Sequence, residues 1–174
     1  MIADLKNDKK VFSIQRSIII LLISTFLIMV AAQAIAEDFK CRLISGYTKL
    51  EVIKVGDEEG HLMGYYERKG LMLYENGEVA NEANRGVFDR AKGGTKWQGY
   101  CVQTFKDGST TWMKHQGTRV KDQIAEATFE FIKGTGRFEG IKGQGTITGR
   151  WITYTEDHGG YEDLQFTGNY TLPQ

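Results

Sequence analysis

The chain has 174 residues, with 22 basic and 22 acidic side chains, two cysteines, 21 glycines and one proline. Beyond residue 36 the balance is 18 Lys and Arg against 20 Asp and Glu, which is not the basic excess that a nucleic-acid binder needs to displace counterions. No nucleic-acid partner is therefore expected. The length suits one hydrophobic core and is short for two ordinary domains.

The first 36 residues have the pattern of a secretory signal peptide. An uncharged apolar run at residues 18–32 follows four basic side chains and precedes Ala-x-Ala sequences at residues 32–34 and 34–36. We expect a signal-peptide helix that is cleaved, so that residues 37–174 form one exported domain, periplasmic or secreted. A retained membrane anchor is the alternative, because residues 17–36 just reach the roughly 20 residues that span a bilayer. The protein is expected to touch the membrane only through this segment.

The rest of the chain shows strand signals between glycine-containing turns. Apolar and polar side chains alternate with period two, which gives each strand one dry face and one wet face. Asn76-Gly77 and Asp107-Gly108 predict hairpins with two-residue turns. Expected strand segments are residues 48–55, 71–75, 78–80, 99–105, 110–116, 125–132, 146–155 and 164–172. This predicts an all-β domain, a sandwich or a small antiparallel barrel of about eight strands.

A glycine-rich segment at residues 134–145 crosses between two of these strands. Its glycines are interpreted as bends, because a phosphate-binding loop would be followed by a helix rather than a strand. Phe138 and Ile141 are its apolar anchors.

Residues 128–149 resemble the "strand, GTG-aromatic-x-G-x-x-G-x-G, strand" signature of the allene oxide cyclase-like barrel superfamily. The matching positions are Gly134, Thr135, Gly136, Phe138, Gly140, Gly143 and Gly145. Plant dirigent proteins and many exported bacterial proteins share this fold, and the resemblance points to the bacterial exported branch. It extends over residues 125–172 and implies an eight-stranded antiparallel barrel with an apolar cavity. It implies no particular function and carries no catalytic residue over to this chain.

Two cysteines, Cys41 and Cys101, are predicted to form a disulfide, because an exported domain with an even cysteine count favours one. Two buried free thiols are the alternative.

Signals for metal, cofactor or catalytic chemistry are weak. His61, His115 and His158 lie far apart, and the acidic residues at 156–163 do not have EF-hand spacing. No metal site and no cofactor are predicted. A GxSxG elbow is missing from the sequence, and in the predicted hairpin Cys101 and His115 lie on opposite faces. We therefore assign no catalytic residue.

Aromatic side chains are the best functional indication. Trp97, Trp112, Phe129, Phe131 and Trp151 are predicted to line a ligand pocket, with a packed core as the alternative. In a two-residue hairpin Trp112 would lie opposite Gln103 and point inward, although a bulge at Gly108 would shift the pairing by one residue. The interior is expected to hold Phe129, Phe131, Leu164, Phe166 and Tyr170.

The predicted function is a non-catalytic module that holds a small apolar ligand inside the barrel. A cyclase or isomerase that uses the same cavity is one alternative, and a structural envelope protein without a ligand is another. Ionisable groups that face inward among aromatics would favour chemistry, whereas a filled interior would favour the structural role. The sequence does not indicate an oligomeric state.

Overall fold

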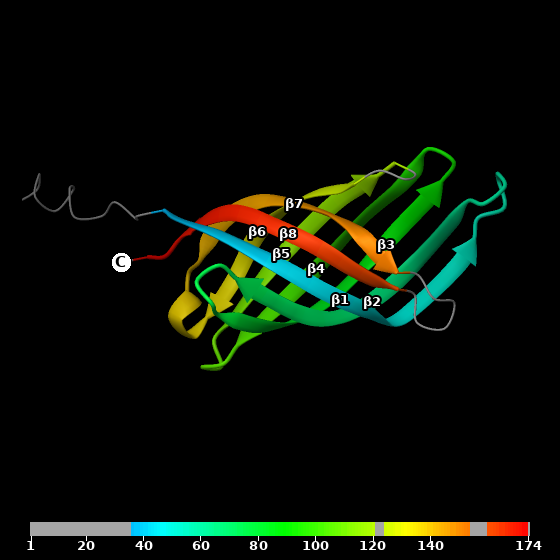
Figure 1. Ribbon diagram of the computed structural model, residues 1–174. Helices are drawn as coiled ribbons and strands as arrows, with labels where there is room; N and C mark the ends of the chain where they lie inside the picture. The colour runs from blue at the N-terminus through cyan, green and yellow to red at the C-terminus, as the bar shows by residue number, and fades with distance from the viewer. Residues whose placement is uncertain (1–35, 121–123, 154–159, 174) are drawn as a thin grey trace, which may run out of the picture. The chain divides into compact units, whose positions relative to one another are not determined.

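The alternating segments form eight antiparallel strands that close into a barrel in a computed structural model (Figure 1). The structure describes residues 36–120, 124–153 and 160–173, together with the side chains of all of these except 151–153. The signal peptide predicted at residues 1–36 therefore lies, except for Ala36, outside the described residues. In the described part the strands are β1 (Glu37–Lys54), β2 (Leu62–Tyr74), β3 (Val79–Ala91), β4 (Gly94–Phe105), β5 (Thr110–Arg119), β6 (Ala125–Thr135), β7 (Lys142–Thr153) and β8 (Tyr161–Thr171). The prediction of an all-β, eight-stranded antiparallel barrel is confirmed.

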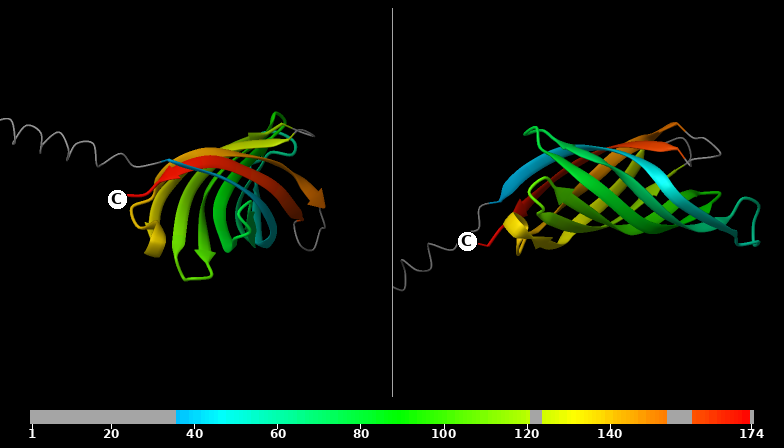
Figure 2. Two further views of the ribbon diagram at one scale, coloured as in Figure 1. Left: turned by 60° about the vertical axis from the view of Figure 1, so that its left-hand side comes forward. Right: turned by 90° about the horizontal axis from the view of Figure 1, so that it is seen from below.

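The barrel closes through the pairing of β1 with β8. Each other strand pairs with its neighbours in chain order, and Cys41 on β1 lies opposite Phe166 on β8. Figure 2 shows the strands running obliquely around the closed wall. Closure gives every strand a neighbour on both sides, and it sends every second side chain into one shared interior.

Both predicted hairpins exist, but each has a three-residue loop rather than the predicted two-residue turn. In the second hairpin the Phe105 N–H donates to the Ser109 carbonyl at 2.9 Å, and the Gly108 N–H donates to the Phe105 carbonyl at 3.0 Å. Gly108 has φ +83°, the left-handed conformation that a loop of this length requires. The first hairpin repeats this arrangement at Gly77. The extra loop residue shifts the pairing of the following strand by one position.

One end of the barrel is filled by apolar side chains. The short helical turn η1 (Gly136–Phe138) and the residues after it bring Phe138 and Ile141 into this end, where both are buried. Phe138 lies 4.7 Å from Phe105 between ring centroids. The five side chains that the sequence placed inside also belong to this core or pack against it, which confirms that prediction: Phe129, Phe131, Leu164, Phe166 and Tyr170.

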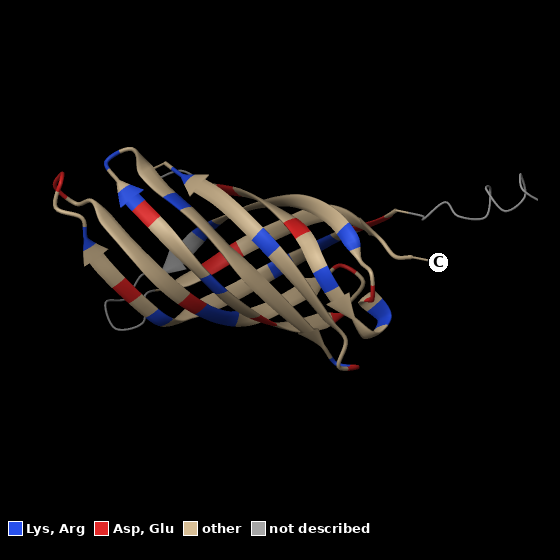
Figure 3. Ribbon diagram, turned by 180° about the vertical axis from the view of Figure 1, so that it is seen from behind, with Lys and Arg blue, Asp and Glu red and all other residues tan. Residues whose placement is uncertain are grey.

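The outer wall carries charges of both signs. Figure 3 shows Lys and Arg interspersed with Asp and Glu along the strands. Glu67 on β2 pairs with Arg85 on β3 at 3.5 Å, and Lys114 on β5 approaches Glu130 on β6 at 4.0 Å. Such exposed pairs stabilise a fold by less than about 1 kcal/mol each. Within the described residues, no helix has the length and apolar character needed to cross a bilayer.

Cys41 and Cys101 are free thiols in this structure, not the disulfide that the sequence favoured. Cys41 lies on β1 and Cys101 on β4, with β2 and β3 between them in the barrel wall. A disulfide spans Cα atoms at most about 7 Å apart, whereas three strand spacings of about 4.8 Å separate β1 from β4 along the wall. Both thiols are buried, and burial raises the pKa of Cys41 to about 12. The pKa of Cys101 is also raised, first by burial and then by the nearby Glu82.

We expect both thiols to react with iodoacetamide only after unfolding. Burial and a raised pKa keep the reactive thiolate scarce in the folded barrel. Mass spectrometry of protein unfolded without a reductant should show two alkylated cysteines, while the folded protein should show slow labelling. An intramolecular link that survives until a reductant is added would contradict the free-thiol assignment.

Candidate functional site

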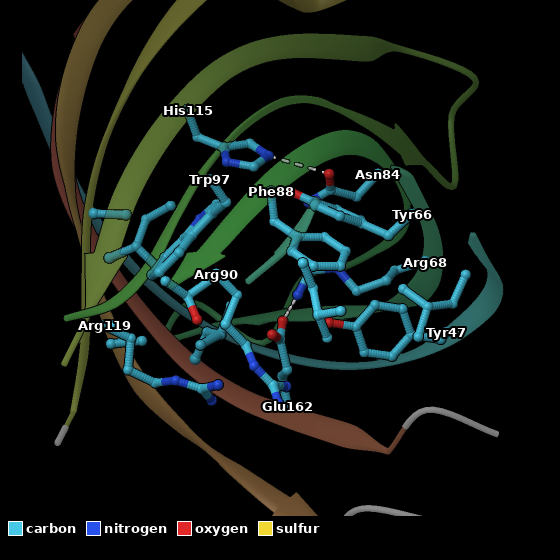
Figure 4. Close-up of a pocket in the computed structure, with 18 of the residues that line it drawn as sticks. Tyr47, Tyr66, Arg68, Asn84, Phe88, Arg90, Trp97, His115, Arg119 and Glu162 are labelled. Carbon is cyan, nitrogen blue, oxygen red and sulfur yellow. Dashed lines mark hydrogen bonds and ion pairs between the residues drawn. The ribbon is translucent and has the colours of Figure 1, made fainter. Parts of the chain in front are cut away.

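The other half of the barrel is hollow. A cavity of about 950 Å³ opens at the end that carries the β1–β2 loop and the β3–β4 turn, opposite the end closed by Phe138. Figure 4 shows its polar and aromatic side chains converging from several strands. The interior is therefore filled at one end and open at the other.

The rim of the cavity is basic. Arg90 on β3 lies opposite Thr95 on β4, and Thr95 lies opposite Arg119 on β5. All three line the cavity, so two guanidinium groups and one hydroxyl come from a single cross-strand row. Since neighbouring strands are about 4.8 Å apart, the two arginine Cα atoms are separated by about 10 Å.

The next row inward is aromatic. Phe88 lies opposite Trp97, and Trp97 lies opposite Gly117. A Cβ atom on Gly117 would lie 2.5 Å from Cζ2 of Trp97, so only glycine permits this close approach of the indole to the wall. Gly86 plays the same part for the Tyr66 ring. These rings lie against the wall and leave space in the middle of the barrel.

Deeper inside, a buried ion pair bridges over β1, the strand that lies between β2 and β8. Arg68 on β2 pairs with Glu162 on β8, and both side chains are almost fully buried. The Arg68 guanidinium lies 4.7 Å from the centroid of the Tyr66 ring and 5.7 Å from that of Tyr47. Both contacts are within the range of cation–π attraction. Arg68 is thereby held by a carboxylate and two aromatic faces.

His115 is a neutral imidazole in the cavity wall. Its Nε2 lies 3.1 Å from Oδ1 of Asn84. Because an amide oxygen only accepts hydrogen bonds, Nε2 carries the proton and Nδ1 has a lone pair. This buried Nδ1 has no hydrogen-bond partner among the described residues. Burial, and next the charge of Arg68, lower the pKa of His115 to about 3.

Glu82 lies two residues further from the mouth than Asn84 on the same strand. Its side chain is 3% exposed, and neither carboxylate oxygen has a hydrogen-bond partner of good geometry within the described part of the chain. Burial raises its pKa to about 7, an effect that Arg68 and the nearby Cys101 and Asn84 side chains only partly offset. Glu82 therefore changes its protonation state near neutral pH.

No protein-family model matches the sequence, and no curated protein matches it. Among solved structures the chain is similar to the pterocarpan synthase dirigent protein PsPTS1, with a TM-score of 0.52 and 10% identity over 82% of this chain and 99% of that one. A second pterocarpan synthase dirigent protein, GePTS1, has a TM-score of 0.49 and 9% identity over 83% and 96% of the two chains. The chain has the fold of the dirigent proteins. The resemblance seen in the glycine-rich segment is confirmed at the level of the fold.

In this dirigent-like barrel only one of the predicted pocket residues is seen to line the cavity. Trp97 lines it, as the sequence suggested. Phe129 and Phe131 belong to the filled end, where their ring centroids lie 5.6 Å apart. The side chain of Trp151 lies outside the described residues.

The prediction that Trp112 points inward is wrong. The three-residue loop pairs Trp112 with Val102 instead of Gln103, and its neighbours Thr111 and Met113 are the side chains that are buried inside. Trp112 lies on the outer wall, where the Lys133 ammonium is 5.1 Å from the centroid of its ring. The alternative given with that prediction, a bulge at Gly108 that shifts the pairing by one residue, is the arrangement that forms.

Sequence reasoning missed most of the polar cavity residues. Arg68 alternates with the outward Glu67, and Arg90 alternates with the outward Asp89. Because charged side chains occur on both faces of these strands, polarity does not show which face is inside. A glycine opposite an aromatic residue, such as Gly117 opposite Trp97, is a sequence signal that this face of the strand is the inner one.

The loop between β1 and β2 is fastened to the mouth by His61. Its Nδ1 lies 2.6 Å from Asp57 Oδ1 and its Nε2 lies 2.9 Å from Asp89 Oδ1. Carboxylates accept hydrogen bonds, so both ring nitrogens donate at once when the imidazole is protonated. These hydrogen bonds, that of Asp57 first, raise the pKa of His61. Glu58 adds a contact by accepting the Lys92 backbone N–H at 3.1 Å.

We expect NMR titration to separate these two histidines. His61 should titrate above the ordinary value of about 6.5, and Asp89→Asn should lower its pKa by removing one carboxylate. His115 should remain neutral until its pKa of about 3. The stability that comes from His61 is full below its unfolded pKa and is lost as the pH rises through its raised folded pKa. A His115 ring that titrates near 6.5 would contradict its assignment as a buried neutral group.

We also expect Glu82 to make the stability depend on pH, because burial raises its pKa, whereas hydrogen bonds raise that of His61. Its folded pKa of about 7 lies above the ordinary value of 4.5, so the folded state holds this proton more tightly. The stability gained from protonation is full below pH 4.5 and falls by about 3 kcal/mol as the pH rises to about 7. Glu82→Gln should flatten this part of the profile in urea unfolding at pH 4.5 to 8. The matched control, Glu130→Gln on the outer wall, should leave it unchanged, and equal profiles for all three proteins would refute the claim.

Proposed function

We propose that this chain is an exported barrel that binds a small aromatic or apolar molecule in its hollow half. The observation that carries the proposal is the cavity of about 950 Å³, open at one end and lined by Phe88, Trp97 and Tyr66. Ligand pockets of proteins typically have volumes of about 300–1,000 Å³ with apolar and aromatic walls. The export is part of the proposal and depends on the signal-peptide pattern of residues 1–36.

The hollow interior supports binding over a purely structural role. A barrel that served only as a stable envelope component would gain from filling its interior, because buried apolar area stabilises a fold by about 25 cal/mol per Å². The aromatic rings near Gly86 and Gly117 instead lie against the wall and leave the centre open. The centre of the barrel thus stays open although larger or inward-turned side chains would have filled it.

The protonation states of the cavity support binding over proton transfer. His115 faces the cavity, but its low pKa of about 3 makes it a weak base. Glu162 is held by Arg68, and Glu82, whose pKa is near neutral, lies deeper than the residues that line the cavity. A general base needs both a suitable pKa and reach to the substrate. Neither His115 nor Glu82 combines these two properties.

One structural neighbour is named a pterocarpan synthase, so in that protein the fold accompanies a synthase function. At 10% identity the two chains share the fold alone, and one fold serves many functions. A cyclase or isomerase in this chain accordingly draws its support from the fold, whereas a binding role draws its support from the cavity itself.

The test compares two tryptophans on neighbouring strands. The neutral probe N-phenyl-1-naphthylamine should bind in the cavity and become fluorescent. Trp97→Ala should weaken its binding by about tenfold or more, because a central aromatic contact contributes about 1.4 kcal/mol or more. Trp112→Ala, on the outer wall, is the matched control and should leave the affinity unchanged.

Thermal melting of both variants separates loss of binding from loss of fold. If the probe binds neither the native protein nor the control variant, the cavity is not a binding site for apolar molecules. Equal weakening by both substitutions would place the probe elsewhere on the protein.

A further inference from the structure

The charged side chains around the cavity are unevenly distributed. Residues 37–174 as a whole have a slight acidic excess, 18 basic against 20 acidic. Among the described residues, the cavity lining has five basic side chains, Arg68, Arg90, Lys92, Arg119 and Arg150, and two acidic ones, Glu59 and Glu162. Arg68 and Glu162 neutralise each other as an ion pair. The remaining groups make the outer part of the cavity positive, against the balance of the whole domain.

Two of these basic groups share one row at the rim. Arg90 and Arg119 flank Thr95, and all three side chains line the cavity. Within the described part of the chain Arg90 makes no ion pair with an acidic side chain. Two guanidinium groups that extend from Cα atoms about 10 Å apart can reach one planar anion between them. A guanidinium matches the geometry of a carboxylate particularly well.

The rim row lies directly beside the aromatic row. Phe88 precedes Arg90 by two residues on β3, and Trp97 follows Thr95 by two residues on β4. Two residues along a strand span about 6.7 Å. Figure 4 shows Arg90, Arg119 and Trp97 around the same cavity. An anionic group at the rim therefore lies about one ring length from the aromatic surface that would hold the body of the ligand.

We propose that the cavity takes an aromatic or apolar molecule with one terminal carboxylate, which lies between Arg90 and Arg119 while its apolar body rests on Phe88 and Trp97. This step depends on the binding function proposed above and adds the charge and orientation of the ligand. The carboxylate neutralises the positive charge of the rim. The apolar body of the ligand fills the space in the centre of the barrel that the rings lying against the wall leave open. The Thr95 hydroxyl supplies a further donor at the same row.

The test uses two probes that differ only in their head group, 2-naphthoate and the neutral 2-naphthamide. Calorimetry with the full chain at pH 7 and low salt should show the naphthoate binding about tenfold tighter or better, the equivalent of about 1.4 kcal/mol. Added salt should reduce this preference. Arg90→Gln and Arg119→Gln should each reduce the affinity for naphthoate and leave that for naphthamide unchanged.

Arg85→Gln provides the matched control, because Arg85 lies on the same strand as Arg90 but points outward and pairs with Glu67. It should alter neither affinity. Equal binding of both probes to the native protein would overturn the carboxylate inference and leave the binding function standing. Binding of neither probe would count against both. If one arginine variant fails to fold, as its melting curve would show, the other decides the result.

Discussion

Closure of the sheet is the constraint on which the rest of this structure depends. Once β1 pairs with β8, every strand must send alternate side chains into an interior of limited width. The sizes of those side chains then determine whether the interior is filled or hollow at each height along the barrel axis. At the filled end, Phe39 on β1 and Phe129 on β6 have ring centroids 5.9 Å apart, and Phe138 packs against Phe105. Nearer the mouth, Trp97 and Tyr66 lie over glycines and the centre stays open.

The open half places charged groups where a stable core would place apolar ones. The ion pair of Arg68 and Glu162 is almost fully buried, and Glu82 is buried without hydrogen-bond partners of good geometry among the described residues. Buried ion pairs are often no more stabilising than apolar side chains of the same volume, and an unpaired buried carboxyl is destabilising. These groups therefore weaken the fold while they shape the field inside the cavity. A ligand that contacts the Arg68–Glu162 pair in the cavity would recover part of this free energy.

The position of one glycine shows how sharply the interior depends on register. Asp107-Gly108 correctly predicted a hairpin, but Gly108 ends a three-residue loop rather than a two-residue turn. Because side chains alternate with period two, this single residue exchanges the two faces of β5. Met113 and His115 face inward as a result, and Trp112 faces outward. Both faces of the strand carry large side chains, so the amount of buried apolar area does not distinguish the two registers in advance.

The sequence by itself determined the fold class, the approximate number of strands, the positions of the hairpins and the aromatic core of the last strands. These features follow from local patterns, namely alternation, turn glycines and the glycine-rich segment near Phe138. The cavity and its residues were decided only by the tertiary structure. Arg90 and Arg119 are 29 positions apart and become partners in one row through two successive strand pairings. Strands with charges on both faces do not reveal their inward side, so the direction of Arg68 or Arg90 depends on barrel closure and register, which no local pattern contains.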